Sequence, residues 1–396
     1  MRADHPVPGH AGIITVPRTI LHLIDTGGPG GAETIFAELV TRLGPAEWRS
    51  VPVVPKDDWL ASTLRERGSD PMVLPSRRSF DLSYLRALRS IVTRHDVDLV
   101  QTHLLSTSVY GTLATWFRGI PVVSTFHGVP DIPAGGLLIP VKRAILRERR
   151  NHVVFVSRSL RDRLGWGSRS RGHPPQVIPN GIDCGVFRME GSSALRRELG
   201  LGGDALLLGA LGNLRPSKRY DVLLEAFALV RDRVSSAHLA IAGQPKDPLF
   251  QELLQRRLAL GLEDSVHFLG FRSDVPEFLR GLDLFVLSSG DEGFSLATVQ
   301  AMATGLPIVA TRCGGPEEIV EHGAHGVLVE VEDPPSLARG ILDVLSMPDR
   351  GKGMGRAARE RAVDRFSVEA MIRQYEALYR RSLGLPEKGR VGCAGS

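Results

Sequence analysis

Short apolar runs alternate with amphipathic segments along most of the chain. The run at 19–25 (TILHLID) predicts a buried strand, and the apolar positions between 35 and 43 recur with the spacing of one helix face. The first half contains these further expected elements: strands at 51–55, 98–103, 121–128 and 152–157, and a helix at 81–95. Strands that alternate with helices indicate crossover connections and a parallel sheet covered on both faces.

The alternation pauses at a polar connector and then begins again. A turn rich in Asn and Gly follows a strand end near 177–183 (VIPNGID), and a polar stretch extends over 188–204. The second half contains these expected elements: strands at 205–212, 238–243, 266–271, 283–289, 308–311 and 326–330, and helices at 220–233, 248–260 and about 367–382. The pattern predicts two successive α/β sheets. Ligands of open parallel sheets bind outside the carboxyl ends of the strands, so a cleft between the two sheets is the expected binding site.

Composition supports a cytoplasmic enzyme with two domains. A chain of 396 residues exceeds the usual size of one core. Its three cysteines (Cys184, Cys313 and Cys393) are far apart and fit neither a disulfide framework nor a metal site, so a reducing compartment is expected. No uncharged apolar run approaches the ~20 residues of a membrane-spanning helix, and the first residues lack the apolar core of a secretory signal.

The net charge of +5 is concentrated in one region. Residues 142–171 contain ten lysines and arginines but only two acidic residues. Such a region can attract an anionic membrane surface, a phosphorylated acceptor or nucleic acid, and a solvated helix face is an equally good interpretation. No nucleic-acid-binding motif accompanies it and aromatic residues are only 6% of the chain, so we expect no nucleic-acid partner.

Two loops after predicted strands are suited to anions. The turn GGPGG at 27–31 lets backbone N–H groups and a helix N-terminus face a phosphate, although it matches neither the P-loop nor the spaced dinucleotide fingerprint. The loop at 212–218 (GNLRPSK) adds Arg215 and Lys218, two cations that suit a diphosphate whose charge grows as a bond to it breaks. Two solvated loop charges are the alternative interpretation.

The segment 291–311 (DEGFSLATVQAMATGLPIVAT) predicts a loop, a helix, a tight turn and a buried strand. Glu292 stands at the mouth of the helix, and Gln300 follows eight positions later. Two helical turns would place both side chains on one face. A carboxylate and an amide arranged in this way suit the hydroxyl groups of a polar ligand.

Six short motifs occur in an order that resembles a known family. They are GGAE at 30–33, TFHG at 125–128, PNGID at 179–183, GNLRPSK at 212–218, E-x7-Q at 292–300 and GGPEEIV at 314–320. The set resembles the retaining glycosyltransferases of family 4 (glycosyl transferases group 1), over about residues 19–382. The resemblance implies the GT-B fold, in which two Rossmann-like domains face a cleft and a C-terminal helix crosses back to the first domain.

The expected division of the chain follows from this resemblance. In chain order it comprises a flexible extension (1–18), an acceptor-side domain (19–184), a linker (185–205), a donor-binding domain (206–365), a crossover helix (366–384) and a flexible tail (385–396).

The resemblance also implies roles for the motif residues in donor binding. Glu292 would contact the hydroxyls of the donor sugar and count as catalytic, and Lys218 would bind the diphosphate. Arg215 would supply the charge of an arginine that the family often has at the position of Asn213. Gln300 stands where a second Glu usually holds the ribose, so its amide can still hydrogen-bond but without the strength of a charged group.

The remaining expected site residues lie around the same cleft. His127 would be the active-site histidine beside the bond that breaks, with a capped core histidine as the alternative. His103, at an earlier strand end, would bind the acceptor or be structural. The other donor contacts implied are the backbone N–H groups of Gly31, Phe294 and Ser295, and Phe271 beside the nucleotide base.

The implied reaction moves a sugar from a nucleotide-diphosphate donor to an acceptor hydroxyl with retained configuration and without a cofactor or metal ion. The leaving diphosphate would help to deprotonate the acceptor, which we expect to be a glycan or lipid-linked glycan of envelope or exopolysaccharide synthesis. The enzyme would then be cytoplasmic or attached to the inner face of the membrane. One alternative is a sugar-nucleotide epimerase of the same fold, although its additional acid–base residues are missing. The other is a weakly active sugar-nucleotide-binding homologue, which Asn213 and Gln300 suggest.

Overall fold

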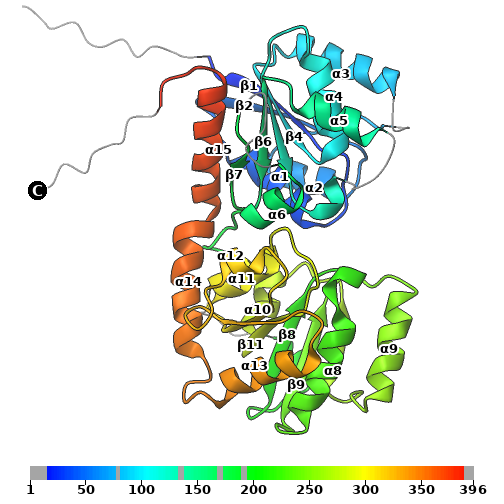
Figure 1. Ribbon diagram of the computed structural model, residues 1–396, viewed down its shortest axis with the longest axis vertical. Coiled ribbons are helices and arrows are strands. Elements are labelled where there is room, and N and C mark those ends of the chain that lie inside the picture. Colours follow the sequence, from blue (N-terminus) through cyan, green and yellow to red (C-terminus); the bar gives the residue numbers. More distant parts are fainter. Residues whose placement is uncertain (1–15, 77–80, 133–137, 167–172, 189–193, 388–396) are drawn as a thin grey trace, which may run out of the picture.

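The computed structural model describes residues 16–76, 81–132, 138–166, 173–188 and 194–387. Two α/β lobes lie one above the other, and the last two helices run along one side of both (Figure 1). Most of the expected N-terminal extension and C-terminal tail, including Cys393, and part of the basic region lie outside the described residues.

The first lobe contains a seven-stranded parallel sheet in the order β3-β2-β1-β4-β5-β6-β7. Its strands are β1 (Arg18–Leu23), β2 (Trp48–Val54), β3 (Met72–Val73), β4 (Leu99–His103), β5 (Val122–Phe126), β6 (Asn151–Phe155) and β7 (Gln176–Val177). The central strands are near-continuous apolar runs because helices cover both faces of the sheet. Strands β4 and β5 pair so that His103 lies opposite Thr125, which brings their carboxyl ends together.

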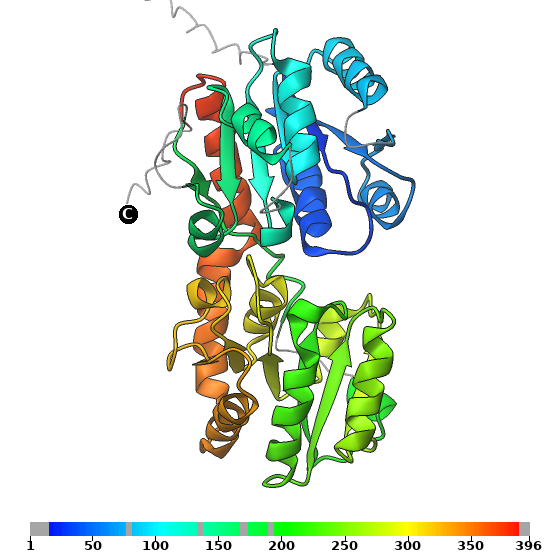
Figure 2. The ribbon, with the colours of Figure 1, turned by 45° about the vertical axis from the view of Figure 1, so that its right-hand side comes forward.

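The second lobe contains a six-stranded parallel sheet in the order β10-β9-β8-β11-β12-β13. Its strands are β8 (Leu206–Leu211), β9 (Ala237–Ala242), β10 (Val266–Gly270), β11 (Leu284–Leu287), β12 (Ile308–Thr311) and β13 (Val327–Val329). The carboxyl ends of the strands in this lobe carry the loops that form the site. The prediction of two parallel-sheet domains is therefore confirmed (Figure 2).

Helices fill the connections between the strands of both sheets. In the first lobe they are α1 (Gly31–Arg42), α2 (Trp59–Glu66), α3 (Leu82–Arg94), α4 (Leu105–Thr115), α5 (Ile139–Leu146), α6 (Arg158–Arg163) and the 3-10 turn η1 (Val129–Asp131). In the second they are α7 (Leu195–Glu198), α8 (Tyr220–Arg231), α9 (Leu249–Ala259), α10 (Val275–Arg280), α11 (Leu296–Thr304), α12 (Pro316–Ile319), α13 (Pro334–Ser346) and the 3-10 turn η2 (Pro216–Lys218). None of the described helices is long and apolar enough to cross a membrane.

The C-terminal segment consists of two helices, α14 (Lys352–Phe366) and α15 (Val368–Ser382), which are separated at Ser367. Ser367 has an extended backbone (φ −68°, ψ 149°), and it pairs with Ile182 on the other connection between the lobes. The N–H of Ile182 donates to the carbonyl of Phe366 (2.9 Å), and the N–H of Val368 donates to the carbonyl of Ile182 (2.8 Å). The two passages of the chain between the lobes are thus hydrogen-bonded to each other.

Helix α15 belongs to the core of the first lobe although it lies at the other end of the sequence. Its residues Met371, Tyr375 and Tyr379 are at most 1% exposed and pack with Ile20 of β1 and Leu39 of α1. Helix α14 instead packs on α11 of the second lobe. Burial of these large side chains stabilises the return of the chain to the first lobe, at roughly 1.5–3 kcal/mol for each fully buried side chain.

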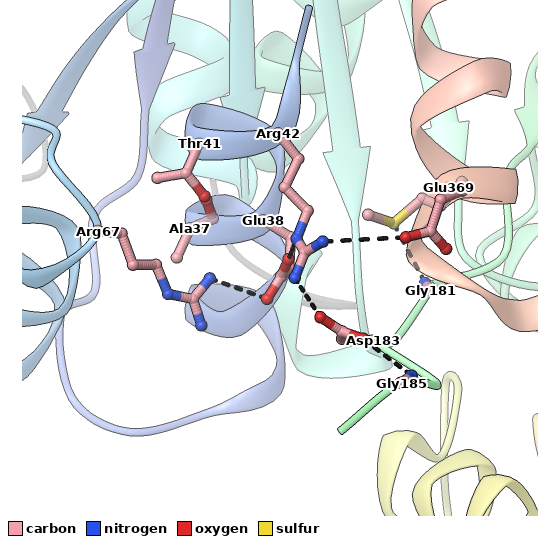
Figure 3. A network of polar contacts seen from close by, with 10 residues as sticks. Ala37, Glu38, Thr41, Arg42, Arg67, Gly181, Asp183, Gly185 and Glu369 are labelled. Atoms are coloured by element: carbon pink, nitrogen blue, oxygen red, sulfur yellow. Dashed lines mark hydrogen bonds and ion pairs between the residues drawn. The ribbon is translucent and has the colours of Figure 1, made fainter. Parts of the chain in front are cut away.

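A charged network joins α1 to both interlobe connections (Figure 3). Glu38, whose side chain is only 8% exposed, accepts from Arg42 (2.5 Å) and from Arg67 (2.8 Å). Arg42 also contacts Asp183 on the first connection (2.5 Å) and Glu369 at the start of α15 (3.9 Å). Because the buried carboxylate has two cationic partners, its burial does not leave an unpaired charge.

Candidate functional site

An ion pair between two predicted donor-binding residues lies at the carboxyl end of the second sheet. Lys218 Nζ lies 2.6 Å from Glu292 Oε1, and the hydroxyl of Ser289 donates to the same oxygen at 2.8 Å. Both charged side chains are largely buried, with 18% and 13% exposed. The hydroxyl of Ser288 donates to the carbonyl of Lys218 (2.8 Å), which links the two loops that carry the pair.

Glu292 lies in the loop before α11, as predicted, so the distance of two helical turns between Glu292 and Gln300 does not apply. Helix α11 begins at Leu296, after a cap in which the Ser295 hydroxyl accepts from the N–H of Thr298 (3.3 Å). Glu292 is instead held by backbone pairing with the loop after β12, where its N–H donates to the carbonyl of Cys313 (3.1 Å). Gln300 is half-buried in α11.

Glycines make room for Lys218 at the end of β8. A Cβ on Gly212 would lie 2.8 Å from Cε of Lys218, and a Cβ on Gly243 would lie 1.9 Å from the carbonyl oxygen of Gly212. Gly212 also has a φ of +153°, which L side chains rarely adopt. Side chains at these two positions would therefore displace the lysine or separate the loops.

Glycines lie at points where the two lobes contact each other. A Cβ on Gly31, the first residue of α1, would lie 3.2 Å from the side chain of Leu296, the first residue of α11. A Cβ on Gly293 would lie 2.3 Å from the carbonyl oxygen of His127. The Ser157 hydroxyl donates across the same boundary to the carbonyl of Gly293 (2.6 Å). The N-termini of α1 and α11 therefore lie against each other, and Gly293, the residue after Glu292, lies at the same boundary.

Asn213 bridges the lobes, a role that the sequence analysis missed. Its amide nitrogen donates to the carbonyl of Pro29 in the glycine-rich turn (3.2 Å), and its amide oxygen accepts from the N–H of Gln244 (3.2 Å). The GGPGG turn and the GNLRPSK loop are thus in direct contact. The sequence indicated only that Asn213 stands at a position where the family often has an arginine.

His127 lies just beyond β5, on the first-lobe side of the same boundary. The carboxylate of Asp131 accepts from the N–H groups of His127 (2.5 Å) and Gly128 (2.9 Å), which fixes the turn after the strand. Burial lowers the pKa of His127 to about 3, so its imidazole is neutral at physiological pH. Burial also raises the pKa of Asp131 to about 6, against its two hydrogen bonds.

His103 is fully buried at the end of β4 and touches His127 directly. Its Nδ1 lies 2.8 Å from Nε2 of His127, and the two rings stack with centroids 5.1 Å apart. Burial lowers the pKa of His103 well below its usual value. A fully buried side chain in contact with His127 favours a structural role over direct acceptor contact.

The other predicted donor residues lie in different environments. Phe294 is 8% exposed, and its ring packs edge-on against Phe366 of α14, 5.7 Å between centroids. Phe271 is 49% exposed after β10. Arg215 is exposed and lines a groove of about 510 Å³ together with residues of α8 and α9. Within the described parts of the chain, no N–H of Phe294 or Ser295 donates a hydrogen bond.

Charged groups across the boundary hold the lobes in this arrangement. Arg163 of α6 forms a two-pronged pair with Asp291, at 2.6 and 2.9 Å. Glu318 of α12 accepts from the N–H groups of Arg158 (3.1 Å) and Ser159 (2.7 Å) at the start of α6. Sequence reasoning missed these contacts because each partner is more than 100 residues from the other. Among the described residues, no three His, Cys, Asp or Glu side chains are grouped as metal ligands.

Comparisons with known proteins agree with this architecture. A model of the family described as Glycosyltransferase Family 4 matches residues 29–186, and one described as Glycosyl transferases group 1 matches residues 192–361. The N-acetyl-alpha-D-glucosaminyl L-malate synthase of Bacillus anthracis is 30% identical over 318 residues, which cover 79% of this chain and 82% of that protein. A D-inositol 3-phosphate glycosyltransferase of Segniliparus rotundus is 28% identical over 369 residues, or 89% of this chain and 81% of that protein.

Solved structures have the same fold. The crystal structure of Anabaena HepE in complex with UDP and glucose has a TM-score of 0.82 at 24% identity, and covers 92% of this chain and 100% of that chain. The complex of HepE with UDP-glucose has a TM-score of 0.80 at 25% identity, covering 91% of this chain and 99% of that chain. The motifs, the two facing lobes and these relatives lead to one conclusion: the chain belongs to the family 4 glycosyltransferases and has the GT-B fold.

Proposed function

We propose that this glycosyltransferase takes its sugar from a nucleotide-diphosphate donor and transfers it to an acceptor hydroxyl with retained configuration. The observation that carries the proposal is the buried Lys218–Glu292 pair, which lies beside the glycines where the lobes meet. A lysine can balance a diphosphate, and a carboxylate can accept hydrogen bonds from sugar hydroxyls. The similar HepE, solved with UDP-glucose, supports a donor of this class.

The geometry favours stabilisation of the leaving group as the main contribution of the protein. Lys218 and the N-terminal N–H groups of α1 and α11 would balance the charge that grows on the departing diphosphate. Its oxygen would take the proton of the acceptor hydroxyl on the same face of the sugar. A double displacement would need a free carboxylate below the anomeric carbon, whereas Asp131 is occupied by two backbone N–H groups. We propose no metal ion in this step.

Two successive experiments test the donor class and the anomeric configuration of the product. Thermal-shift screening with UDP-, GDP- and ADP-sugars identifies the donor, because a ligand that binds only the folded state raises its stability. NMR of the product then shows the anomeric configuration, and EDTA should leave the rate unchanged. Turnover of labelled donor to an epimer without acceptor would instead support the epimerase, and binding with neither transfer nor hydrolysis would support the non-catalytic homologue.

Variants of the ion pair test the assignment of the site. Glu292→Gln and Lys218→Met should each lower kcat/KM by about a hundredfold, since each removes a charged contact to the donor. Matched exposed controls, Glu263→Gln and Lys352→Met, should retain full activity. Wild-type rates in both Glu292→Gln and Lys218→Met would refute the proposed site.

We also propose a glycan or lipid-linked glycan as the acceptor, presented at an anionic membrane surface. Exposed apolar side chains lie next to the basic region. Val141 of α5 is 55% exposed, and Phe117, which follows the neighbouring helix α4, is 88% exposed. Exposed apolar groups among cations suit an anionic interface. Sedimentation with anionic vesicles should decrease on Phe117→Ser and at high salt. No binding to anionic vesicles at low salt would refute this part of the proposal.

A further inference from the structure

A chain of buried polar side chains leads from the C-terminal helix to His127. The hydroxyl of Tyr379 on α15 donates to Oε1 of Gln101 on β4 (2.9 Å). Nε2 of Gln101 lies 3.3 Å from Nε2 of His103, two residues further along the strand. Nδ1 of His103 then lies 2.8 Å from Nε2 of His127. Tyr379, Gln101 and His103 are all 0% exposed, so water does not compete for these contacts.

The orientation of the Gln101 amide is determined by its other neighbours. Its Nε2 lies 3.1 Å from the backbone carbonyl of Thr102 and 3.0 Å from the hydroxyl oxygen of Thr125. A carbonyl oxygen can only accept, so the amide atom beside it must be the NH₂ group. The amide oxygen correspondingly receives the hydroxyl of Tyr379.

The amide orientation determines which nitrogen of each histidine carries its proton. The NH₂ group that faces Nε2 of His103 has no lone pair to offer, whichever acceptors its two hydrogens use. A hydrogen on Nε2 of His103 would therefore point at another donor, which places the proton on Nδ1. The Nδ1–H of His103 then donates to Nε2 of His127, which leaves the proton of neutral His127 on its own Nδ1. That Nδ1 is buried and has no hydrogen-bond partner among the described residues.

We propose that Gln101 and His103 are positioning residues that hold His127 in the Nδ1–H form, so that it donates a hydrogen bond to the molecule bound between the lobes. The inference rests on the proposed function only for the identity of that molecule, a sugar hydroxyl or phosphate oxygen of the donor. In this form His127 is a donor, because its Nε2 lone pair is already used by His103. It is therefore not the base that deprotonates the acceptor.

The proposal implies that helix α15 helps to position His127 through Tyr379. A buried donor without a partner is destabilising, and a ligand that accepts its hydrogen bond removes this cost. Tyr379 is the far end of the relay and belongs to the helix that follows the interlobe connection at Ser367.

The tautomers can be read by long-range 1H–15N NMR of the ligand-free full chain labelled with 15N-histidine, with resonances assigned by His103→Gln and His127→Gln. We expect both histidines in the neutral Nδ1–H form. In Gln101→Leu the constraint is absent, so the two forms should mix and kcat should fall about fivefold with the donor KM little changed. Tyr379→Phe should change the tautomer proportions and kcat in the same direction but less strongly. This variant tests the proposal if Gln101→Leu does not fold. Gln374→Leu, an exposed amide of α15, is the matched control.

Each NMR result either supports or overturns the proposed tautomer of His127. An Nε2–H form of His127 in the wild type would overturn the proposal, as would unchanged histidine signals in a folded Gln101→Leu or Tyr379→Phe variant. The spectrum needs no donor, so the proposed function and this assignment fail separately. If no nucleotide sugar supports transfer, the proposed function is refuted, but the observed tautomer of His127 still stands.

Discussion

The first lobe should lose stability in mild acid because it buries neutral histidines, and His22 offers the cleanest test. His22 on β1 is 0% exposed, and among the described residues neither ring nitrogen has a hydrogen-bond partner. Burial lowers its pKa from 6.5 to about 3. A histidine with a lowered folded pKa favours the native state fully above the unfolded pKa. This contribution is lost as the pH falls from about 6.5 toward 3, because only the unfolded chain takes up the proton.

The magnitude follows from this shift. At pH 5 an unfolded imidazole with an ordinary pKa is almost fully protonated, whereas His22 stays neutral in the folded protein, which costs about 2 kcal/mol relative to pH 7. His22→Leu removes this pH-dependent loss of stability. The difference in unfolding free energy, variant minus wild type, should therefore be about 2 kcal/mol more positive at pH 5 than at pH 7.

Urea unfolding followed by tryptophan fluorescence is the assay. All four tryptophans (Trp48, Trp59, Trp116 and Trp166) are in the first lobe, so the signal reports the lobe that contains His22. Leu21→Val, a loss of apolar volume at the neighbouring position, should cost the same at both pH values. The raised pKa of Asp131 acts in the opposite direction, but it is present in both proteins and cancels in the comparison. Equal effects of His22→Leu at pH 5 and pH 7 would refute the reasoning.

Three further changes test the meeting of the lobes and the donor loops. Gly293→Ala should lower transfer by about a hundredfold and enlarge the radius measured by X-ray scattering, because its Cβ would lie 2.3 Å from a backbone carbonyl of the other lobe. Gly290→Ala, whose nearest neighbour would be 3.4 Å away, is the control in the same loop. Asn213→Ala should raise the donor KM several-fold by removing the hydrogen bond to Pro29, and an unchanged KM would show that this contact does not matter. Gln300→Glu should tighten donor binding in calorimetry if the amide contacts the ribose, since a carboxylate accepts more strongly.

The fold could be predicted largely from the sequence because both sheets are buried on two faces. Continuous apolar strands and amphipathic helices are local patterns, so β1, β4 and β8 lie where the pattern predicted. Helix α14 was not predicted. It has only a narrow face of small residues, with Ala358 and Ala362 buried, and its apolar period is weak. The division at Ser367 was also missed, because it depends on pairing with Ile182, which is distant in the sequence.

The candidate site was only partly predictable. Lys218 and Glu292 belong to motifs with fixed spacing, and the structure brings them to 2.6 Å. The loop position of Glu292 was predicted, but the backbone pairing with the loop after β12 that holds it there was not. The bridge made by Asn213 and the relay through Gln101 depend on contacts between distant segments, which no local pattern encodes. The roles of these residues in transfer remain predictions.

The C-terminal helix α15 connects the interlobe passage at Ser367 with the candidate site. The start of α15 pairs with the other interlobe connection at Ile182, and its Tyr379 hydrogen-bonds to the strand that carries His103. Ser367 therefore directly precedes the same helix that fixes the Gln101 amide. Because that helix is packed rigidly in the core of the first lobe, the relay should stay intact while the second lobe moves. In this arrangement the first lobe holds His127 at the boundary, where its backbone lies against Gly293, the residue that follows Glu292 of the second lobe.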